Sequence, residues 1–103
     1  MRRTREELDN KIREISGFQN VYFQPPSKMN YPCILYQKEK NDKHNANDSM
    51  YLNKVRYTIT IIGKESENEF LINKFLRSFK NIDSDRRYIS PDNLYHDVLI
   101  LYW

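Results

Sequence analysis

The sequence YLNKVRYTITIIG, residues 51–63, carries the clearest secondary-structure signal in the chain. Apolar residues occupy every second position from Val55 to Ile61, and polar residues from Lys54 to Thr60 lie between them. A period of two is typical of a β-strand that packs one face against a core. The sequence therefore predicts a strand near the middle of the chain, and the other elements are expected to build a sheet around it.

Four other stretches also predict strands. Pro25 and Pro26 end the first of them, and the turn-forming residues from Ser90 to Asn93 separate the last two. The second and the last are apolar on both faces, which is typical of interior or covered strands. The four are VYFQ at residues 21–24, PCILYQK at 32–38, RRYIS at 86–90 and LYHDVLILYW at 94–103.

Two matches to the capping-box pattern S/T-x-x-E predict two helices. Thr4 with Glu7 opens the first, which carries a narrow apolar stripe and ends at Gly17. Ser66 with Glu69 opens the second, NEFLINKFLRSFK, whose apolar residues recur at helical spacing. Both helices are expected to pack through one face.

The order of these elements, α-β-β-β-α-β-β, predicts the fold class. Short connections favour antiparallel neighbours, so we expect an α+β domain with a mainly antiparallel sheet of four to five strands and two helices on one of its faces. With 103 residues and a mass of 12.6 kDa, the chain has room for one core. Residues 1–103 are therefore interpreted as one domain, with a flexible polar loop at 37–50.

Charge and composition limit the classes of function. The net charge is +3 and the isoelectric point is near 9.0, but basic and acidic residues mostly cancel along the chain. The one local excess, at residues 74–87, is smaller than nucleic-acid-binding proteins usually show. A single cysteine excludes an internal disulfide, and no apolar run approaches the roughly 20 residues of a membrane span. We expect a soluble protein made in a cytoplasm.

Residues that carry catalysis or bind metals are sparse. His44 and His96 have no Cys or His at ligand spacing, and Cys33 lies in an apolar strand. Burial would raise the pKa of that thiol and lower its reactivity. No phosphate-binding loop or nucleophile motif is present. The sequence predicts no enzyme and no catalytic, metal-binding or cofactor-binding residue.

Two segments favour a role in assembly. The polar stretch QKEKNDKHNANDSM, residues 37–50, exceeds the usual hairpin loop of about 2–5 residues, and we expect a partner to order it. The C-terminal strand, apolar on both faces, is either central in the sheet or covered by another subunit. The predicted contact residues are Lys40, Lys43, His44, Asn45, Asn47, Met50, Tyr95, Leu101 and Trp103.

The same segments carry a family resemblance. MNYPCILYQK, VRYTITII and YISPDNLYHDVLILYW together resemble a family of small tailed-phage proteins described as tail-completion or tail-terminator proteins. The strongest parts are residues 31–36 and 92–102. One departure is that GKESENEF runs straight into a helix, where the family commonly has an Asp/Pro-rich turn.

The resemblance implies a structural protein of the virion neck, assembled in the host cytoplasm. Such a protein packs helices on a sheet, closes into a ring that is typically a hexamer, caps the tail tube and joins the tail to the head connector. Its partners would be further copies of itself, the tail-tube protein and the head–tail connector proteins. DNA would be met only in transit through the channel, with no membrane and no small-molecule substrate.

Two other functions stay open at this point. One is a head-side adaptor or stopper of the same neck. The other is a small nucleic-acid-binding regulator in which Arg2, Arg3 and Arg5, or residues 74–87, touch phosphate. Binding by such a regulator would fall steeply with salt, because counterions are released when phosphates are neutralised.

Overall fold

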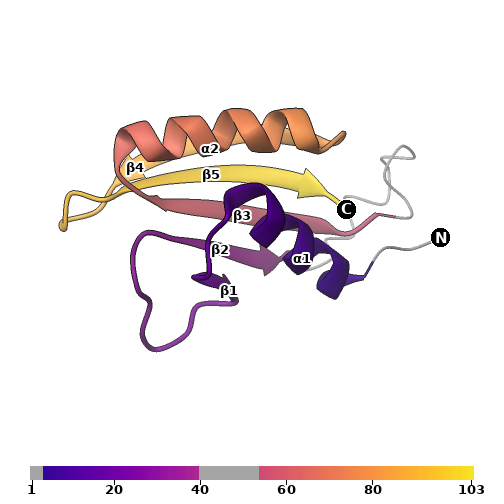
Figure 1. Cartoon of the computed structure of the whole chain (residues 1–103), viewed down its shortest axis with the longest axis horizontal. Coiled ribbons are helices and arrows are strands. Elements are labelled where there is room, and N and C mark those ends of the chain that lie inside the picture. Colours follow the sequence, from indigo (N-terminus) through magenta and orange to yellow (C-terminus); the bar gives the residue numbers. More distant parts are fainter. Residues whose placement is uncertain (1–3, 40–53) are drawn as a thin grey trace.

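The computed structural model describes residues 4–39 and 54–103 of the chain. Its elements follow the predicted order of a helix, three strands, a helix and two strands (Figure 1). They are α1 (Arg5–Ser16), β1 (Val21–Phe23), β2 (Cys33–Lys38), β3 (Arg56–Gly63), α2 (Glu65–Ser78), β4 (Ile82–Ile89) and β5 (Tyr95–Tyr102).

The five strands form one sheet in the order β1-β2-β3-β5-β4. Three neighbouring pairs are antiparallel, as the sequence predicts, but β1 and β2 are parallel. The chain turns away after Phe23, where Gln24 has a φ of 65°, and returns so that Val21 lies opposite Ile34. The predicted α+β class is confirmed, and the expectation of antiparallel neighbours fails at this one pair.

Both helices cover the same face of the sheet. Leu8 and Ile12 of α1 and Leu71 and Phe75 of α2 are buried in a single hydrophobic cluster. The strand residues beneath them come from alternate positions of the central strands, because side chains on a strand point to the two faces in turn. These residues are Ile34, Tyr36, Tyr57, Ile59, Ile61, Leu99 and Leu101.

The ends of α1 are the predicted ones. The Thr4 hydroxyl accepts a hydrogen bond from the backbone N–H of Glu7 at 3.2 Å. Gly17 closes the helix in the left-handed conformation, with φ 72°, and its N–H donates to the Arg13 carbonyl at 2.8 Å. A hydroxyl cap and a left-handed glycine together satisfy backbone groups that a helix leaves unpaired.

The predicted start of α2 is wrong. The helix begins at Glu65, so Lys64 is its N-cap and makes no side-chain cap bond, while Ser66 lies within the first turn. β3 runs to Gly63, which leaves one residue between strand and helix. A Cβ at Gly63 would lie 3.1 Å from Asn68 Oδ1. The close contact of strand and helix sets the helix start, and the hydroxyl does not.

The C-terminal strand is central, which is one of the two interpretations that its apolar faces allow. β5 lies between β3 and β4, and Leu101 and Trp103 are 1% and 6% exposed. The Trp103 indole N–H donates to the Thr4 carbonyl at 2.9 Å, and its ring packs edge-on against Phe79. Leu101 and Trp103, which the sequence predicts as contact residues, are covered by the helices of the chain itself.

The strand β4 is longer than predicted, because it includes the charged residues before Arg86. The turn after it brings the Asn93 N–H within 2.9 Å of the Ser90 carbonyl, and Asn93 has a φ of 61°. Asparagine tolerates the left-handed region better than most side chains. The predicted turn therefore forms a tight hairpin between β4 and β5.

Candidate functional site: the two edges of the sheet

The outer edge of β4 is the most exposed part of the sheet. Every residue of this strand is exposed except Ile82, and β4 is the last strand in the order. Within residues 4–39 and 54–103, no strand pairs with that edge. An edge strand offers a row of backbone donors and acceptors to any chain that lies beside it.

The hairpin shows which backbone groups of β4 point outward. The Ser90 N–H donates to the Leu94 carbonyl at 2.9 Å, and hydrogen-bonded positions alternate along an antiparallel pair. Tyr88 therefore bonds to β5, while the N–H and C=O of Arg87 and Ile89 point away from the sheet. The side chains here are also accessible, with Tyr88 48% and Ile89 55% exposed.

The first half of β4 is less suited to pairing. The register shifts between Ser84 and Arg86, so the strand is bulged at Asp85. The Arg86 guanidinium makes an ion pair with the Asp85 carboxylate at 2.6 Å. Bulges and charged side chains are common protections of sheet edges. Residues 87–89 therefore form the part of the edge that another strand fits best, and we call them the open edge.

A buried polar cluster holds the open edge in place. Arg87 Nε donates to Asp97 Oδ1 at 2.6 Å, and the hydrogen bond raises the pKa of the Arg87 guanidinium. Asn68 of α2 donates to Asp97 Oδ2 at 2.8 Å and to the carbonyls of Ile61 and Tyr95. Asp97 and Asn68 are both buried. These bonds connect α2, β3, β5 and β4, so they hold β4 in a fixed position.

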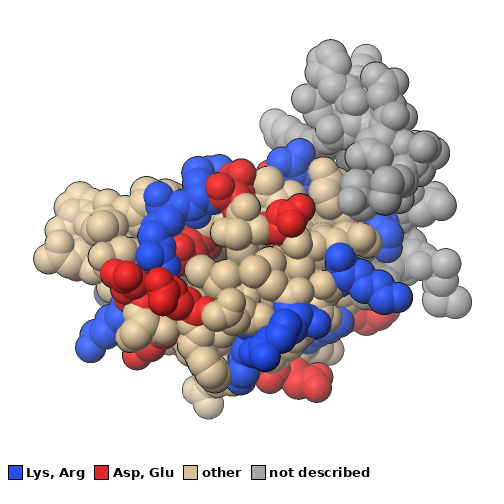
Figure 2. Space-filling view, turned by 90° about the horizontal axis from the view of Figure 1, so that it is seen from above, with Lys and Arg blue, Asp and Glu red and all other residues tan. Residues whose placement is uncertain are grey.

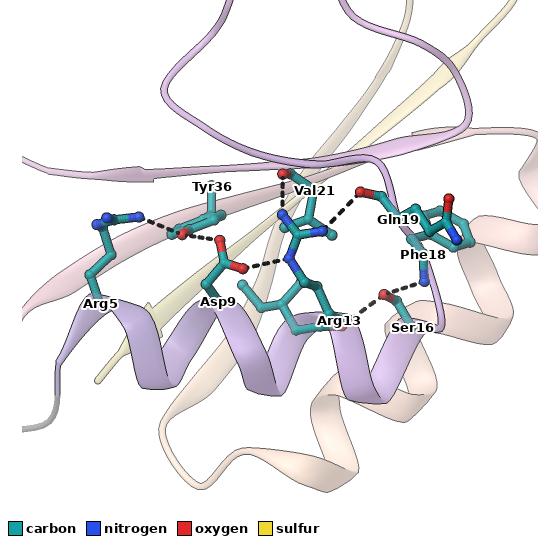
Figure 3. A network of polar contacts seen from close by, with 9 residues as sticks. Arg5, Asp9, Arg13, Ser16, Phe18, Gln19, Val21 and Tyr36 are labelled. Atoms are coloured by element: carbon teal, nitrogen blue, oxygen red, sulfur yellow. Dashed lines mark hydrogen bonds and ion pairs between the residues drawn. The ribbon is translucent and has the colours of Figure 1, made fainter.

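The opposite edge, at β1, is closed by an arginine of α1. Arg13 Nη1 donates to the Gln19 carbonyl at 2.9 Å, and Nη2 donates to the Val21 carbonyl at 3.0 Å (Figure 3). The Ile34 N–H bonds to the carbonyl of Asn20, so the groups of Val21 face away from β2. The guanidinium occupies a position that a further strand would take.

A chain of polar contacts fixes the position of Arg13. The Asp9 carboxylate accepts from Arg13 Nε at 2.6 Å and from the Tyr36 hydroxyl at 2.5 Å, and Arg5 donates to Tyr36 at 3.1 Å (Figure 3). Burial opposes ionisation of Asp9, but the hydrogen bonds from Tyr36 and Arg13 keep its pKa below the ordinary value. Burial and the bond to Asp9 raise the pKa of Tyr36 to about 12. Asp9 is therefore charged at neutral pH and holds Arg13 electrostatically.

The face of the sheet that no helix covers carries an imidazole, that of His96, and a thiol, that of Cys33. The Tyr88 ring stacks on His96 at a centroid distance of 4.6 Å, and burial lowers the pKa of His96. His96 Nε2 is buried without a hydrogen-bond partner. Cys33 is buried too, and burial raises the pKa of its thiol to about 11. Cys33 is buried, as the sequence indicates, and both residues are neutral at physiological pH.

The structure brings few of the sequence-predicted contact residues together. Tyr95 is half-buried opposite Ile89, and the Arg87 guanidinium lies 5.1 Å from the centre of its ring, so Tyr95 borders the open edge. Leu101 and Trp103 lie in the core. The other predicted residues, namely Lys40, Lys43, His44, Asn45, Asn47 and Met50, lie outside the described residues.

The sequence interpretation missed Arg13, Tyr88 and Ile89. An edge can be recognised only when the order of strands is known, and that order is not written in local periodicity. One signal was available for β1: the two prolines that follow it are frequent beside edge strands because proline lacks a backbone N–H.

On the α2 side of the molecule, the described residues form no stripe of single-sign charge (Figure 2). Seen from the side on which α2 lies, Lys and Arg are interspersed with Asp and Glu (Figure 2). Within residues 4–39 and 54–103, no three His, Cys, Asp or Glu side chains gather to hold a metal ion, and neither helix is long and apolar enough to cross a membrane. A comparison with protein-family models, curated proteins and solved structures finds no match to this chain.

Proposed function

We propose that the chain is a structural protein of a phage virion, a tail terminator that forms a ring, caps the tail tube and joins the tail to the head connector. The sequence resemblance at residues 31–36 and 92–102 suggests this role, and the α+β fold with two helices on one face is the architecture that the resemblance implies. The open edge of β4 is the observation that carries the proposal.

A ring subunit must present a surface that a neighbour can cover. The open edge offers outward backbone groups at Arg87 and Ile89, beside the exposed side chains of Tyr88 and Ile89. Main-chain bonds to an edge strand supply affinity, and the alternating side chains supply specificity. Because Arg87 is tied to Asp97 and through it to α2, little ordering would be needed when a neighbour binds.

The surroundings of Cys33 and His96 favour a role in assembly over a role in catalysis. The Cys33 thiol is buried and protonated at neutral pH, so it is a poor nucleophile. The His96 ring is stacked on Tyr88 and shares its surroundings with no second histidine among the described residues. A buried thiol and a packed imidazole support a role without catalysis.

The test is native mass spectrometry of the full chain, first alone and then mixed with the tail-tube protein encoded in the same genome. We expect a closed ring, alone or on mixing, of about six copies, because the family resemblance implies a hexamer. A monomer under both conditions would contradict the terminator and favour the head-side adaptor. The adaptor is tested by the same measurement after mixing with the head–tail connector protein.

A second measurement addresses the nucleic-acid alternative. Binding of a short DNA duplex is followed by fluorescence anisotropy between about 50 and 200 mM salt, where a protein that contacts many phosphates loses orders of magnitude in affinity. Because the basic side chains are interspersed with acidic ones, we expect weak binding at the lowest salt only. Tight binding with a steep salt dependence would favour the regulator.

A further inference from the structure

The two edges of the sheet differ in how they are finished. At β4 the open edge leaves backbone groups of Arg87 and Ile89 pointing outward, while at β1 the Arg13 guanidinium already binds the carbonyls of Gln19 and Val21. One edge can therefore accept a strand at once, and the other only after a side chain has moved. The two edges are therefore unlike, and a head-to-tail contact between copies joins two unlike surfaces.

We propose that Arg13 is a releasable guard of the β1 edge, and that in the assembled ring β1 of one subunit pairs with β4 of the next copy. This inference rests on the proposed function and specifies its interface. The two strands are the opposite edges of one sheet, so each copy offers two different edges, each with backbone donors and acceptors. Repeated pairing of unlike surfaces generates a closed ring when the rotation between copies closes.

Before assembly, hydrogen bonds hold the Arg13 guanidinium at the β1 edge. Asp9 binds Arg13 Nε, Tyr36 binds Asp9, and Arg5 binds Tyr36, so the guanidinium cannot rotate freely away from the edge. Pairing between free copies is thereby made less favourable before they reach the tail. Natural proteins commonly cover or charge an edge strand for this reason.

The contacts of Arg13 are also weak enough for an arriving strand to displace its side chain from the β1 edge. The Arg13 side chain is 43% exposed, and its ion pair with Asp9 lies at the surface, where solvent screens the attraction. Hydrogen bonds from a guanidinium to two backbone carbonyls can be replaced by bonds from the N–H groups of an arriving strand. The backbone groups of Val21 and Phe23 point away from β2, because Asn20 and Gln24 bond to β2. The Val21 N–H already donates to the Gln19 carbonyl at 3.0 Å, so an arriving strand would bond the Val21 carbonyl and the backbone of Phe23.

The test uses the full chain with Arg13→Ala, and Arg77→Ala is the matched control. Both changes remove an exposed helix arginine, but Arg77 lies on α2, outside the polar network around Asp9, and only Arg13 binds the backbone at the β1 edge. By native mass spectrometry without tail-tube protein, we expect Arg13→Ala to assemble at a concentration about tenfold below that which the wild-type chain needs. Arg77→Ala should resemble the wild type.

A second substitution separates edge pairing from general aggregation. Ile89→Pro removes an outward N–H from β4 and no bond to β5, because the backbone of Ile89 points away from the sheet. In the Arg13→Ala background it should return the chain to the wild-type size, while Ile89→Thr keeps the N–H and should leave the assembly intact. Circular dichroism confirms that each variant is folded.

The outcomes distinguish the guard from the proposed function. If Arg13→Ala keeps the wild-type size, or if Ile89→Pro fails to reverse its assembly, the guard is wrong. If Ile89→Pro also leaves the ring on the tail-tube protein unchanged, the β1–β4 contact is wrong while the terminator stands. If the wild-type chain forms no ring with that protein but Arg13→Ala assembles and Ile89→Pro reverses it, the guard stands and the terminator is wrong.

Discussion

Asn68 shows how much a single buried side chain contributes to the arrangement of this sheet. It is 1% exposed, and its amide donates to the carbonyls of Ile61 and Tyr95 and to the Asp97 carboxylate. A smaller side chain would leave buried acceptors without their donor. The cost of leaving such groups unpaired exceeds the net value of the hydrogen bonds themselves.

We therefore expect Asn68→Ala to lower the free energy of unfolding by about 2–3 kcal/mol. Urea denaturation followed by circular dichroism measures this change. Asn73→Ala is the control, because Asn73 is an exposed residue of the same helix and should alter stability by less than about 0.5 kcal/mol. Equal effects of the two substitutions would show that the buried amide bonds contribute nothing specific.

Two buried side chains, Cys33 and Tyr36, make the free energy of unfolding depend on pH in the alkaline range. Burial raises the pKa of Cys33 from 9.0 to about 11, and burial with the bond to Asp9 raises that of Tyr36 from 10.0 to about 12. Both groups bind their protons more tightly in the folded chain than in the unfolded one. Their contribution is thus complete below pH 9.0 and is lost as the pH rises through 11 and 12.

The expected result is a constant urea midpoint from about pH 7 to 9 and a steady fall above it. Cys33→Ala removes one of the two groups, so its stability should fall less steeply with pH even though its absolute stability is lower. A midpoint that stays flat to about pH 11 would mean that both groups titrate normally in the folded chain.

At the scale of single elements, the two helices differ in how they begin. α1 starts with a Thr4 cap that bonds the Glu7 N–H, whereas α2 starts with Lys64, which has an extended backbone and no cap bond. A short oxygen-bearing side chain at an N-cap satisfies an unpaired N–H, and a carboxylate also interacts favourably with the helix dipole. Lys64 is exposed, so a change there disturbs no packing.

We expect Lys64→Asp to raise the free energy of unfolding by about 1 kcal/mol and Thr4→Ala to lower it by a similar amount. Both are measured by urea denaturation at low and high salt. Lys64→Ala separates the cap from the loss of a positive charge, since it removes the charge without adding an acceptor. If Lys64→Asp stabilises no more than Lys64→Ala, the missing cap is unimportant.

Elements with strong local signals could be predicted from the sequence. The alternation in β3, the capping box and glycine of α1 and the proline-containing turn before β5 are all local features, and the structure has each of them. The start of α2 could not be predicted in this way, because the contact between Gly63 and Asn68 overrides the hydroxyl of Ser66. The parallel pairing of β1 with β2 depends on a tertiary return of the chain, for which Val21 and Ile34 give no local sign.

The candidate site was harder to predict than the fold, because it depends on the whole molecule. Tyr88 and Ile89 look like any strand residues until the order β1-β2-β3-β5-β4 places their strand at the edge. Arg13 looks like a solvent-facing helix residue until Val21 is brought beside it. Residues that are far apart in sequence meet only after the sheet has formed, so no window of the sequence contains the site.

At the scale of the whole molecule, Trp103 connects the two ends of the described chain. Its indole N–H bonds to the carbonyl of Thr4, its ring packs on Phe79 at the end of α2, and Lys11 Nζ lies 5.7 Å from its ring centre. Trp103 is also the sole tryptophan of the sequence. Its fluorescence therefore reports on the junction of both helices with β5.

If this junction belongs to the single core, the chain should unfold in one cooperative step. We expect the fluorescence of Trp103 and the far-ultraviolet circular dichroism to give the same urea midpoint. Trp103→Phe, which keeps an aromatic ring but loses the indole donor, should shift the dichroism midpoint downward by an amount that corresponds to about 1–3 kcal/mol. A fluorescence change at clearly lower urea would show that the C-terminus detaches first, and then a neighbouring subunit could cover Leu101 and Trp103 after all.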